Sequence, residues 1–304
     1  MTSDDMLIIK VPASTANLGP GFDSVGLALN LYITLEVEQA EHWEVIPLTE
    51  DLKEFPTDES NMIVAIAINT AKQFGKSLPP CKIRVQSDIP LARGLGSSAS
   101  AIVAGIELAN YLGQLFLTKN EKLEIATKIE GHPDNVGASI FGGLVIGSMS
   151  EEDTEIIHSN NVQFDVVAAV PGEELLTKDS RGVLPEQLSF SDAVHAGAVS
   201  NVMIAALLSG NLKLAGKMMM QDQYHQPYRK RLVPSLQILE DIAPKHGALG
   251  IALSGAGPTV ICMTECGNGE ALLGKLQENL VEMNFLLLKI DLEGSTTTLK
   301  RKVI

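Results

Sequence analysis

Residues 90–101 are the part of this chain whose residue types most clearly suggest chemistry, and they read Pro-Leu-Ala-Arg-Gly-Leu-Gly-Ser-Ser-Ala-Ser-Ala. Gly94 and Gly96 allow positive φ angles and a close approach of the backbone to a ligand. Apolar residues then recur at helical spacing, which predicts a helix over residues 97–112. The free N–H groups and the positive dipole end of such a helix attract anions. The segment therefore predicts a loop that holds phosphate groups, and the alternative is an ordinary turn with serine caps.

Two other phosphate-binding motifs fit the chain poorly. The P-loop pattern Gly-x4-Gly-Lys-Ser/Thr does not occur in the sequence. Residues 94–99 match the dinucleotide pattern Gly-x-Gly-x-x-Ala, but that pattern needs a second strand ending in an acidic residue about 20 positions further on. The chain is instead still helical there and reaches a new helix cap at Thr118. A nicotinamide-dependent dehydrogenase is thus a weaker alternative to a phosphate-transferring enzyme.

Length and charge limit the classes of partner. The 304 residues, of which 45% are hydrophobic, are enough for two domains. A net charge of −14 argues against nucleic acid and against an anionic membrane, since both need a basic protein surface. Phosphate must then be bound locally, by backbone N–H groups and a metal ion. The sequence shows no signal peptide and no apolar run of about 18 residues, so we expect a cytoplasmic protein without a membrane partner.

Strands and helices alternate without a strict βαβ rhythm, which predicts an α+β fold in both halves of the chain. We expect strands near residues 7–11, 31–38, 43–48, 82–85, 141–146, 164–170, 248–253 and 259–263. We expect helices near residues 61–74, 97–112, 118–130, 192–208, 212–220, 234–242 and 270–283. Polar and acidic residues around position 155 predict a border between two domains, 1–155 and 156–304.

Two more segments stand out beside the glycine and serine loop. Residues 11–26 contain two prolines and three glycines between apparent strands, together with the polar residues Asn17 and Asp23. Residues 254–259 read Ser-Gly-Ala-Gly-Pro-Thr between two apolar strands. Taken singly, the first is a set of turn residues and the second a simple hairpin.

Taken together, the three segments resemble the three motifs of the GHMP small-molecule kinases, in the same order along the chain. Residues 130–136 (Glu-Gly-His-Pro-Asp-Asn-Val), 177–185 and 225–229 extend the resemblance over nearly the whole sequence. They make the match closest to the family that phosphorylates the amino acid L-homoserine. The resemblance implies an S5-like N-terminal domain, a ferredoxin-like C-terminal domain and a cleft between them that binds ATP and Mg²⁺. It also implies O-phosphohomoserine as product, a place in threonine biosynthesis and a possible homodimer.

The resemblance assigns the ATP phosphates to one loop and the magnesium ion to two residues. The loop residues are Pro90, Leu91, Ala92, Arg93, Gly94, Leu95, Gly96, Ser97, Ser98, Ala99 and Ser100. The implied metal ligands are Ser98 and Glu130. Glu130 also has an independent physical argument, because a carboxylate at the C-terminal end of its helix is disfavoured by about 0.3–1 kcal/mol unless a cation lies beside it.

His132, Asp134 and Asn135 are implied to line the reaction centre, in a loop that Pro133 breaks off from the preceding helix. Mevalonate-type relatives pair an aspartate base with a lysine just after the proline of the first motif. Ser14 stands at that position here, and no Lys or Arg occurs in residues 11–29. We therefore expect in-line attack by the substrate hydroxyl, with Asn135 or Asp134 near the γ-phosphate and the proton lost late.

Homoserine is a zwitterion, so its site needs groups for a carboxylate, an ammonium and a hydroxyl. The resemblance implies Arg181 and Arg229 for the carboxylate, which suits the permanently charged fork of arginine. It implies Asp23 for the ammonium and Asn17 for the hydroxyl. Two alternatives remain open at this point: a GHMP kinase for a different small alcohol, and a catalytically silent sensor on the same scaffold.

Overall fold

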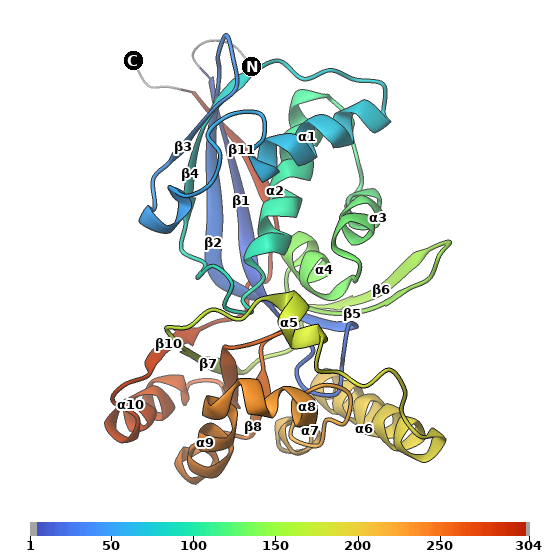
Figure 1. The fold of residues 1–304 in the computed structure, drawn as a ribbon, viewed down its shortest axis with the longest axis vertical. Helices are drawn as coiled ribbons and strands as arrows, with labels where there is room; N and C mark the ends of the chain where they lie inside the picture. Colours follow the sequence, from blue (N-terminus) through green and yellow to red (C-terminus); the bar gives the residue numbers. More distant parts are fainter. Residues whose placement is uncertain (1–4, 302–304) are drawn as a thin grey trace.

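The strands of the protein fall into two sheets, one above the other in Figure 1, in a computed structural model that describes residues 5–301. The first sheet has seven strands in the order β11-β1-β2-β4-β3, with β5 paired to β2 and β6 paired to β5. All of its pairs are antiparallel except β3 with β4. The elements of this half are β1 (Asp5–Ala16), β2 (Val25–Gln39), β3 (Glu44–Pro47), α1 (Met62–Gln73), β4 (Cys81–Ser87), α2 (Ser97–Leu112), α3 (Lys119–Glu130), α4 (Asp134–Phe141), β5 (Leu144–Met149), β6 (Thr154–Ser159) and β11 (Thr296–Arg301).

The second sheet has four antiparallel strands in the order β10-β7-β9-β8. Its elements are β7 (Asp165–Val170), α5 (Thr177–Arg181), α6 (Phe190–Leu208), α7 (Leu212–Met219), α8 (Gln226–Arg229), α9 (Pro234–Ile242), β8 (Gly250–Leu253), β9 (Val260–Thr264), α10 (Gly269–Asn279) and β10 (Asn284–Leu288). Helices separate β7 from β8, and α10 separates β9 from β10, which gives the β-α-β-β-α-β order of ferredoxin-like domains. The expected α+β class with two sheet-based halves is confirmed.

Helices α1 to α4 cover one face of the first sheet, and α2 and α4 pack directly on β1 and β2. The predicted helix over residues 97–112 matches α2 (Ser97–Leu112). The capping signal at Thr118 is also confirmed, since its side chain accepts from the backbone of Glu121 while the Glu121 side chain accepts from the backbone of Thr118. The start of each of these two helices follows from a local sequence signal. Helix α2 begins at the lower edge of the first sheet in Figure 1.

The first strands are longer than predicted. Residues 11–16, expected in a loop, continue β1, whose pairing with β2 shifts register between Pro12 and Ala13. Proline cannot donate to a ladder and is tolerated at such an irregularity. The loop is therefore confined to residues 17–24, where Asn17 (φ 74°) and Asp23 (φ 54°) are left-handed, as turn residues of these types allow.

The last part of the chain differs most from the prediction. The final helix ends at Asn279 and two unpredicted strands follow it, β10 in the second sheet and β11 beside β1 in the first. The border predicted at residue 155 falls inside β6, which pairs with β5 in the first sheet. The chain therefore passes from the first sheet to the second after β6, and it returns to the first sheet between β10 and β11.

Within residues 5–301, α6 is the one helix that is long and apolar enough, by length and composition, to cross a membrane. It packs on α7 and buries Val199, Met203 and Leu207 in the protein. Helices of soluble proteins meet the same two criteria, so this finding is weak evidence for a membrane span.

Candidate active site

The glycine and serine loop is held between the other two motifs. Gly94 (φ 79°) and Gly96 (φ 71°) have the left-handed backbone expected for them. A Cβ on Gly94 would overlap the carbonyl oxygen of Ser254, and one on Gly96 would overlap the side chain of Ser14. The two glycines are therefore required by close contacts with the first and third motifs, in addition to any contact with a ligand.

Hydrogen bonds fix the same arrangement. Ser254 Oγ lies 2.6 Å from the carbonyl oxygen of Gly94 and 2.9 Å from Thr15 Oγ1. The backbone N–H of Ser14 donates to the carbonyl oxygen of Leu95 at 3.2 Å. Hydrogen bonds thus join the three motifs into one unit, although the first and the third lie far apart in the sequence.

Not every residue of the loop presents its side chain to the cleft. Arg93 instead donates from Nε to the carbonyl oxygen of Pro171 at 3.0 Å and from Nη2 to that of Gly172 at 2.6 Å. Leu95 is fully buried in the core, and the buried Ser100 hydroxyl donates to backbone carbonyl oxygens. The loop residues that line the two cavities described below are Leu91, Ala92, Gly94, Gly96, Ser97, Ser98 and Ala99; Pro90 lines neither.

The first turn of α2 offers an anion site. Its N-cap is Gly96, which has no side chain to cap the helix, and the N–H of Ser100 donates to the carbonyl oxygen of Gly96. The N–H groups of residues 97–99 precede that bond and have no acceptor inside the helix. Together with the helix dipole they favour a bound anion at this end.

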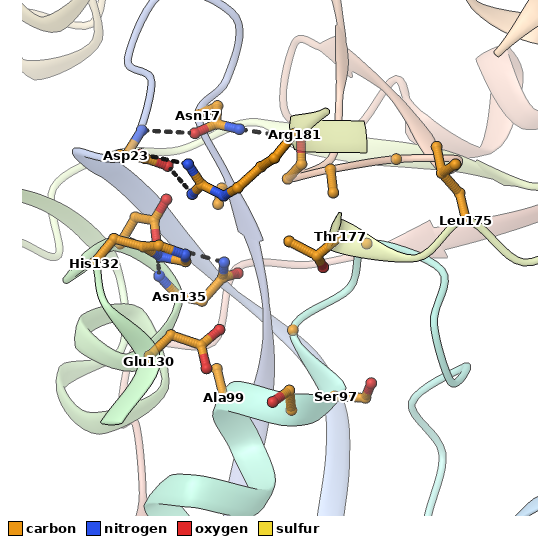
Figure 2. Close-up of a pocket in the computed structure, with 18 of the residues that line it drawn as sticks. Asn17, Asp23, Ser97, Ala99, Glu130, His132, Asn135, Leu175, Thr177 and Arg181 are labelled. Carbon is orange, nitrogen blue, oxygen red and sulfur yellow. Dashed lines mark hydrogen bonds and ion pairs between the residues drawn. The ribbon is translucent and has the colours of Figure 1, made fainter. Parts of the chain in front are cut away.

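Glu130 faces this turn from the end of α3. Its carboxylate points toward Ala99 in Figure 2 and lines the cleft with Ser98. Within the described residues it forms no hydrogen bond or salt bridge. Burial raises the pKa of Glu130, as does the charge of Asp134, while His132 and Arg181 lower it. An unpaired carboxylate at a helix C-terminus is stabilised by a nearby cation.

The segment after Glu130 is not the loop that we expected. Asp134 and Asn135 are the first residues of α4, which begins directly after Pro133 and carries Gly137 in its middle. Asp134 is 1% exposed, and its Oδ1 accepts from the backbone N–H of Asn135 at 2.6 Å. The same oxygen lies 2.8 Å from Nδ1 of His132. The structure thus brings His132, Asp134 and Asn135 together at the cleft, on a helix start.

Electrostatics favour a charged His132. Burial lowers the pKa of His132, but its hydrogen bond to Asp134 and the charges of Asp134, Asp23 and Glu130 outweigh burial and raise the pKa above its ordinary value. Asn135 is held from the other side, because the hydroxyl of Ser14 donates to its Oδ1 at 3.0 Å. Ser14 thus orients Asn135, one of the residues expected at the reaction centre.

Asp23, His132 and Asp134 each place one possible ligand atom within 4.8 Å of the others. Asp23 is already bound by Arg181 and Asp134 by His132. Mg²⁺ prefers oxygen ligands and dehydrates reluctantly. The oxygen pair of Ser98 and Glu130 therefore fits this ion better than a set that includes an imidazole.

Opposite charges meet at the other end of the cleft. Arg181 donates from Nη1 and Nη2 to the two carboxylate oxygens of Asp23, at 3.0 and 2.7 Å (Figure 2). This bond raises the pKa of Arg181. Arg229 is 1% exposed, and burial lowers its pKa to about 10, so it is still protonated at neutral pH. Both guanidinium groups lie about 5.5 Å from the ring centre of Phe22 (5.5 and 5.4 Å), a residue that our sequence analysis did not single out.

Asn17 joins the first and third motifs. Its Nδ2 donates to the carbonyl oxygen of Gly255 at 3.1 Å, and its Oδ1 accepts from the backbone N–H of Asp23 at 2.9 Å. One N–H and one lone pair of the amide remain for a ligand. Asn17 lines the cleft with the other expected substrate residues, Asp23, Arg181 and Arg229.

Two cavities meet at the loop. The cleft that contains the charged residues has a volume of about 270 Å³. A second cavity of about 330 Å³ adjoins it and shares Ala92, Ser97 and Ser98. It is lined mainly by apolar residues, Ile33, Val45, Pro47, Leu52, Phe55, Pro56, Met62, Ile63, Val85, Leu91 and Ala101. Sequence reasoning missed this cavity, because its residues come from β2, β3, β4, α1, α2 and the segments that precede α1 and α2, and share no local pattern.

Known proteins match most of this chain in sequence and in fold. The family of GHMP kinases N terminal domains matches residues 61–143, and the GHMP kinases C terminal family matches residues 203–282. A homoserine kinase from Bacillus licheniformis is 53% identical over 277 residues, which is 91% of this chain and 90% of that protein. A solved structure from Listeria monocytogenes, described as a candidate homoserine kinase, has a TM-score of 0.83 and 41% identity, covering 96% of this chain and 99% of that one. The homoserine kinase structure from Cytophaga hutchinsonii has a TM-score of 0.84 at 25% identity, covering 98% and 99%.

Proposed function

This chain belongs to the homoserine kinases of the GHMP kinase superfamily, and we propose how its cleft carries out the ATP-dependent phosphorylation of L-homoserine. The reaction transfers the γ-phosphoryl group of ATP to the side-chain hydroxyl and yields O-phospho-L-homoserine, within threonine biosynthesis. The observation that carries the assignment of residues is the charge pattern of the cleft. An anion-binding helix start lies at one end, and two arginines with one carboxylate lie at the other.

The Asp23–Arg181 ion pair is the complement of a zwitterion. Homoserine would place its carboxylate on Arg181 and its ammonium on Asp23. Arg181 and Asp23 would then each exchange the other for an opposite charge of the substrate. Arg229 would add a second, buried donor for the carboxylate. Asn17 would use its remaining N–H or lone pair to orient the hydroxyl.

The nucleotide would span the two cavities. The apolar cavity of about 330 Å³ suits a flat base, and its opening at Ser97 and Ser98 leads to the start of α2. The N–H groups of residues 97–99 would then bind the phosphates. Ser98 and Glu130 would hold Mg²⁺, which when bound neutralises charge on the phosphates. The unpaired, half-buried carboxylate of Glu130 supports this choice.

Phosphoryl transfer depends mainly on positioning and charge stabilisation. No lysine lies in the first motif, and Asp134 Oδ1 already accepts from Asn135 and contacts His132. We therefore assign Asp134 the task of orienting its two neighbours. The Asn135 amide and His132, whose charged form is favoured by its raised pKa, would stabilise the transferring phosphoryl group, and the hydroxyl proton would leave late, to phosphate oxygen.

A coupled assay of ADP release with L-homoserine, with the product identified by ³¹P NMR, tests the function. We expect turnover that needs both ATP and Mg²⁺, and little turnover with galactose or mevalonate. Turnover with another alcohol in place of homoserine would identify a different GHMP kinase, and absence of turnover with all of them would identify a silent sensor. Sedimentation velocity on the same preparation tests the homodimer, which is expected from the resemblance alone.

A further inference from the structure

His225 lies fully buried between the first motif and Arg229. Its Nε2 is 2.9 Å from the carbonyl oxygen of Gly19, and its Nδ1 is 3.1 Å from Nη1 of Arg229. Phe22 stacks on the imidazole with ring centres 5.2 Å apart. His225 therefore contacts the loop that carries Asp23 on one side and a substrate-binding arginine on the other, although neither the sequence motifs nor the proposed mechanism gives it a task.

The two contacts fix the protonation of the ring. A carbonyl oxygen only accepts and a guanidinium only donates, so Nε2 must carry the hydrogen and Nδ1 must be a free acceptor. Burial lowers the pKa of His225 to about 4, and the charge of Arg229 also lowers it, while Asp222 raises it. The imidazole is thus a neutral group whose acceptor faces Arg229 and whose donor faces the carbonyl oxygen of Gly19, with Asp222 Oδ2 further away, 3.5 Å from Nε2.

The donors of Arg229 can be accounted for in the same way. Nε donates to the carbonyl oxygen of Ser180 at 3.1 Å. Nη1 donates to the carbonyl oxygen of Gly255 at 3.0 Å and lies 3.1 Å from Nδ1 of His225. These three bonds use three of the five N–H groups of a guanidinium. Both N–H groups of Nη2 are left without an acceptor in the part of the chain that the structure describes, and Arg229 lines the cleft.

We propose that His225 is a positioning residue, whose Nδ1 holds Nη1 of Arg229 so that Nη2 is presented to the carboxylate of the substrate. The inference rests on the proposed role of Arg229 as a carboxylate ligand. His225 is ideally suited to this position, because a positively charged or purely donating side chain would oppose Arg229, and an apolar one would leave a buried N–H of the guanidinium unpaired.

Two conservative variants separate the two bonds of the ring. In His225→Asn the amide oxygen reaches the place of Nδ1, which keeps an acceptor for Arg229 but loses the bond to Gly19. In His225→Gln the amide nitrogen reaches the place of Nε2, which keeps the donor to Gly19 but loses the acceptor at Nδ1. We expect His225→Gln to raise the KM for homoserine by about 10-fold or more, the effect of weakening one charge-assisted hydrogen bond. We expect His225→Asn to stay close to the parent and the KM for ATP to change little in either variant.

The controls are His195→Gln, the same exchange at an exposed histidine of α6, and a thermal melt of every variant. In an Arg229→Leu background, His225→Gln should add no further rise in the KM for homoserine. Additive effects, or a homoserine KM in His225→Gln equal to that of the parent, would overturn the proposal. If His225→Gln does not fold, His225→Asn decides: a KM near that of the parent supports the proposal, and a KM as high as that of Arg229→Leu overturns it. An unchanged KM in Arg229→Leu alone would instead remove the proposed carboxylate ligand, which is a different failure.

Discussion

Replacing Glu130 with Gln should make the protein more stable and less active. The carboxylate of Glu130 lies at the C-terminal end of α3. In the absence of metal, burial and the charge of Asp134 both disfavour its negative charge. The dipole effect alone is worth about 0.3–1 kcal/mol. For a protein of this size that corresponds to a rise in Tm of roughly 0.5–2 °C at pH 7. Glutamine keeps the shape of the side chain, so no cavity or packing change competes with this effect.

The pH dependence of the stability gain has a definite sign. The folded-state pKa of Glu130 lies above its ordinary value of 4.5, so the folded protein favours the neutral form. The parent therefore loses stability relative to Glu130→Gln as the pH rises from 4.5 through the raised pKa, and the difference is constant above it. Below pH 4.5 both proteins carry a neutral group there, and the gain should vanish. Urea unfolding of both proteins from pH 4 to 8, without metal, measures this difference.

The activity should move in the opposite direction. Loss of one preorganised electrostatic group at a reaction centre lowers kcat by about 10²–10³-fold. Addition of Mg²⁺ with nucleotide should raise the Tm of the parent more than that of the variant, because only the parent keeps the carboxylate ligand. Near-normal turnover of Glu130→Gln at limiting Mg²⁺ would remove Glu130 from the metal site. A variant that is less stable than the parent at pH 7 would refute the electrostatic argument.

Four further outcomes are expected. Ser98→Ala should lower kcat and raise the Mg²⁺ requirement without changing the Tm, as titration of turnover with Mg²⁺ would show. Gly96→Ala should lose more stability than Gly75→Ala, because both have positive φ but only the former would overlap a neighbour; strain alone costs about 1–2 kcal/mol in thermal or urea unfolding. Arg229→Leu should raise the KM for homoserine by about 10–150-fold, and 3-amino-1-propanol, which lacks the carboxylate, should suffer little further loss in this variant. The stability that His132 adds over a His132→Gln variant should be full below pH 6.5 and disappear as the pH rises through its raised folded-state pKa, measured by urea unfolding from pH 5.5 to 9.

The loop and its helix could be predicted from sequence because their signals are local. Two glycines, three serines and an apolar helical repeat lie within about 20 residues, and α2 begins and ends where they indicate. The α4 helix was missed because it has only 8 residues, follows a proline and contains Gly137, all of which resemble a loop in a short window. The strands β10 and β11 were missed because each pairs with a strand more than 100 residues away, β7 and β1. Pairing over such a distance leaves little trace in a local pattern.

Most of the candidate residues from the motifs line one cleft, but their bonds to one another were not indicated by the sequence. The resemblance suggested Asp23 and Arg181 as substrate residues, yet no spacing in the sequence indicates that they bind each other. An isolated arginine is usually exposed, whereas Arg229 is buried with its charge held by backbone carbonyl oxygens from two separate segments. Such contacts depend on how the two halves of the chain meet.

If the substrate binds as proposed, the ion pair in the cleft would give a physical reason for amino-acid specificity. Asp23 and Arg181 are each about one-third exposed, 34% and 38%, so water still screens their attraction, and a substrate can separate them at moderate cost. A bound zwitterion would give Asp23 and Arg181 one opposite charge each, and it would add no net charge to the cleft. 4-Hydroxybutyrate carries the carboxylate and hydroxyl of homoserine without its ammonium, and would leave Asp23 without a partner beside Glu130 and Asp134. A neutral sugar would supply neither charge. In the proposed binding mode the same two residues attract the zwitterion and penalise its competitors, since only a ligand with both charges gives each separated residue a new opposite partner.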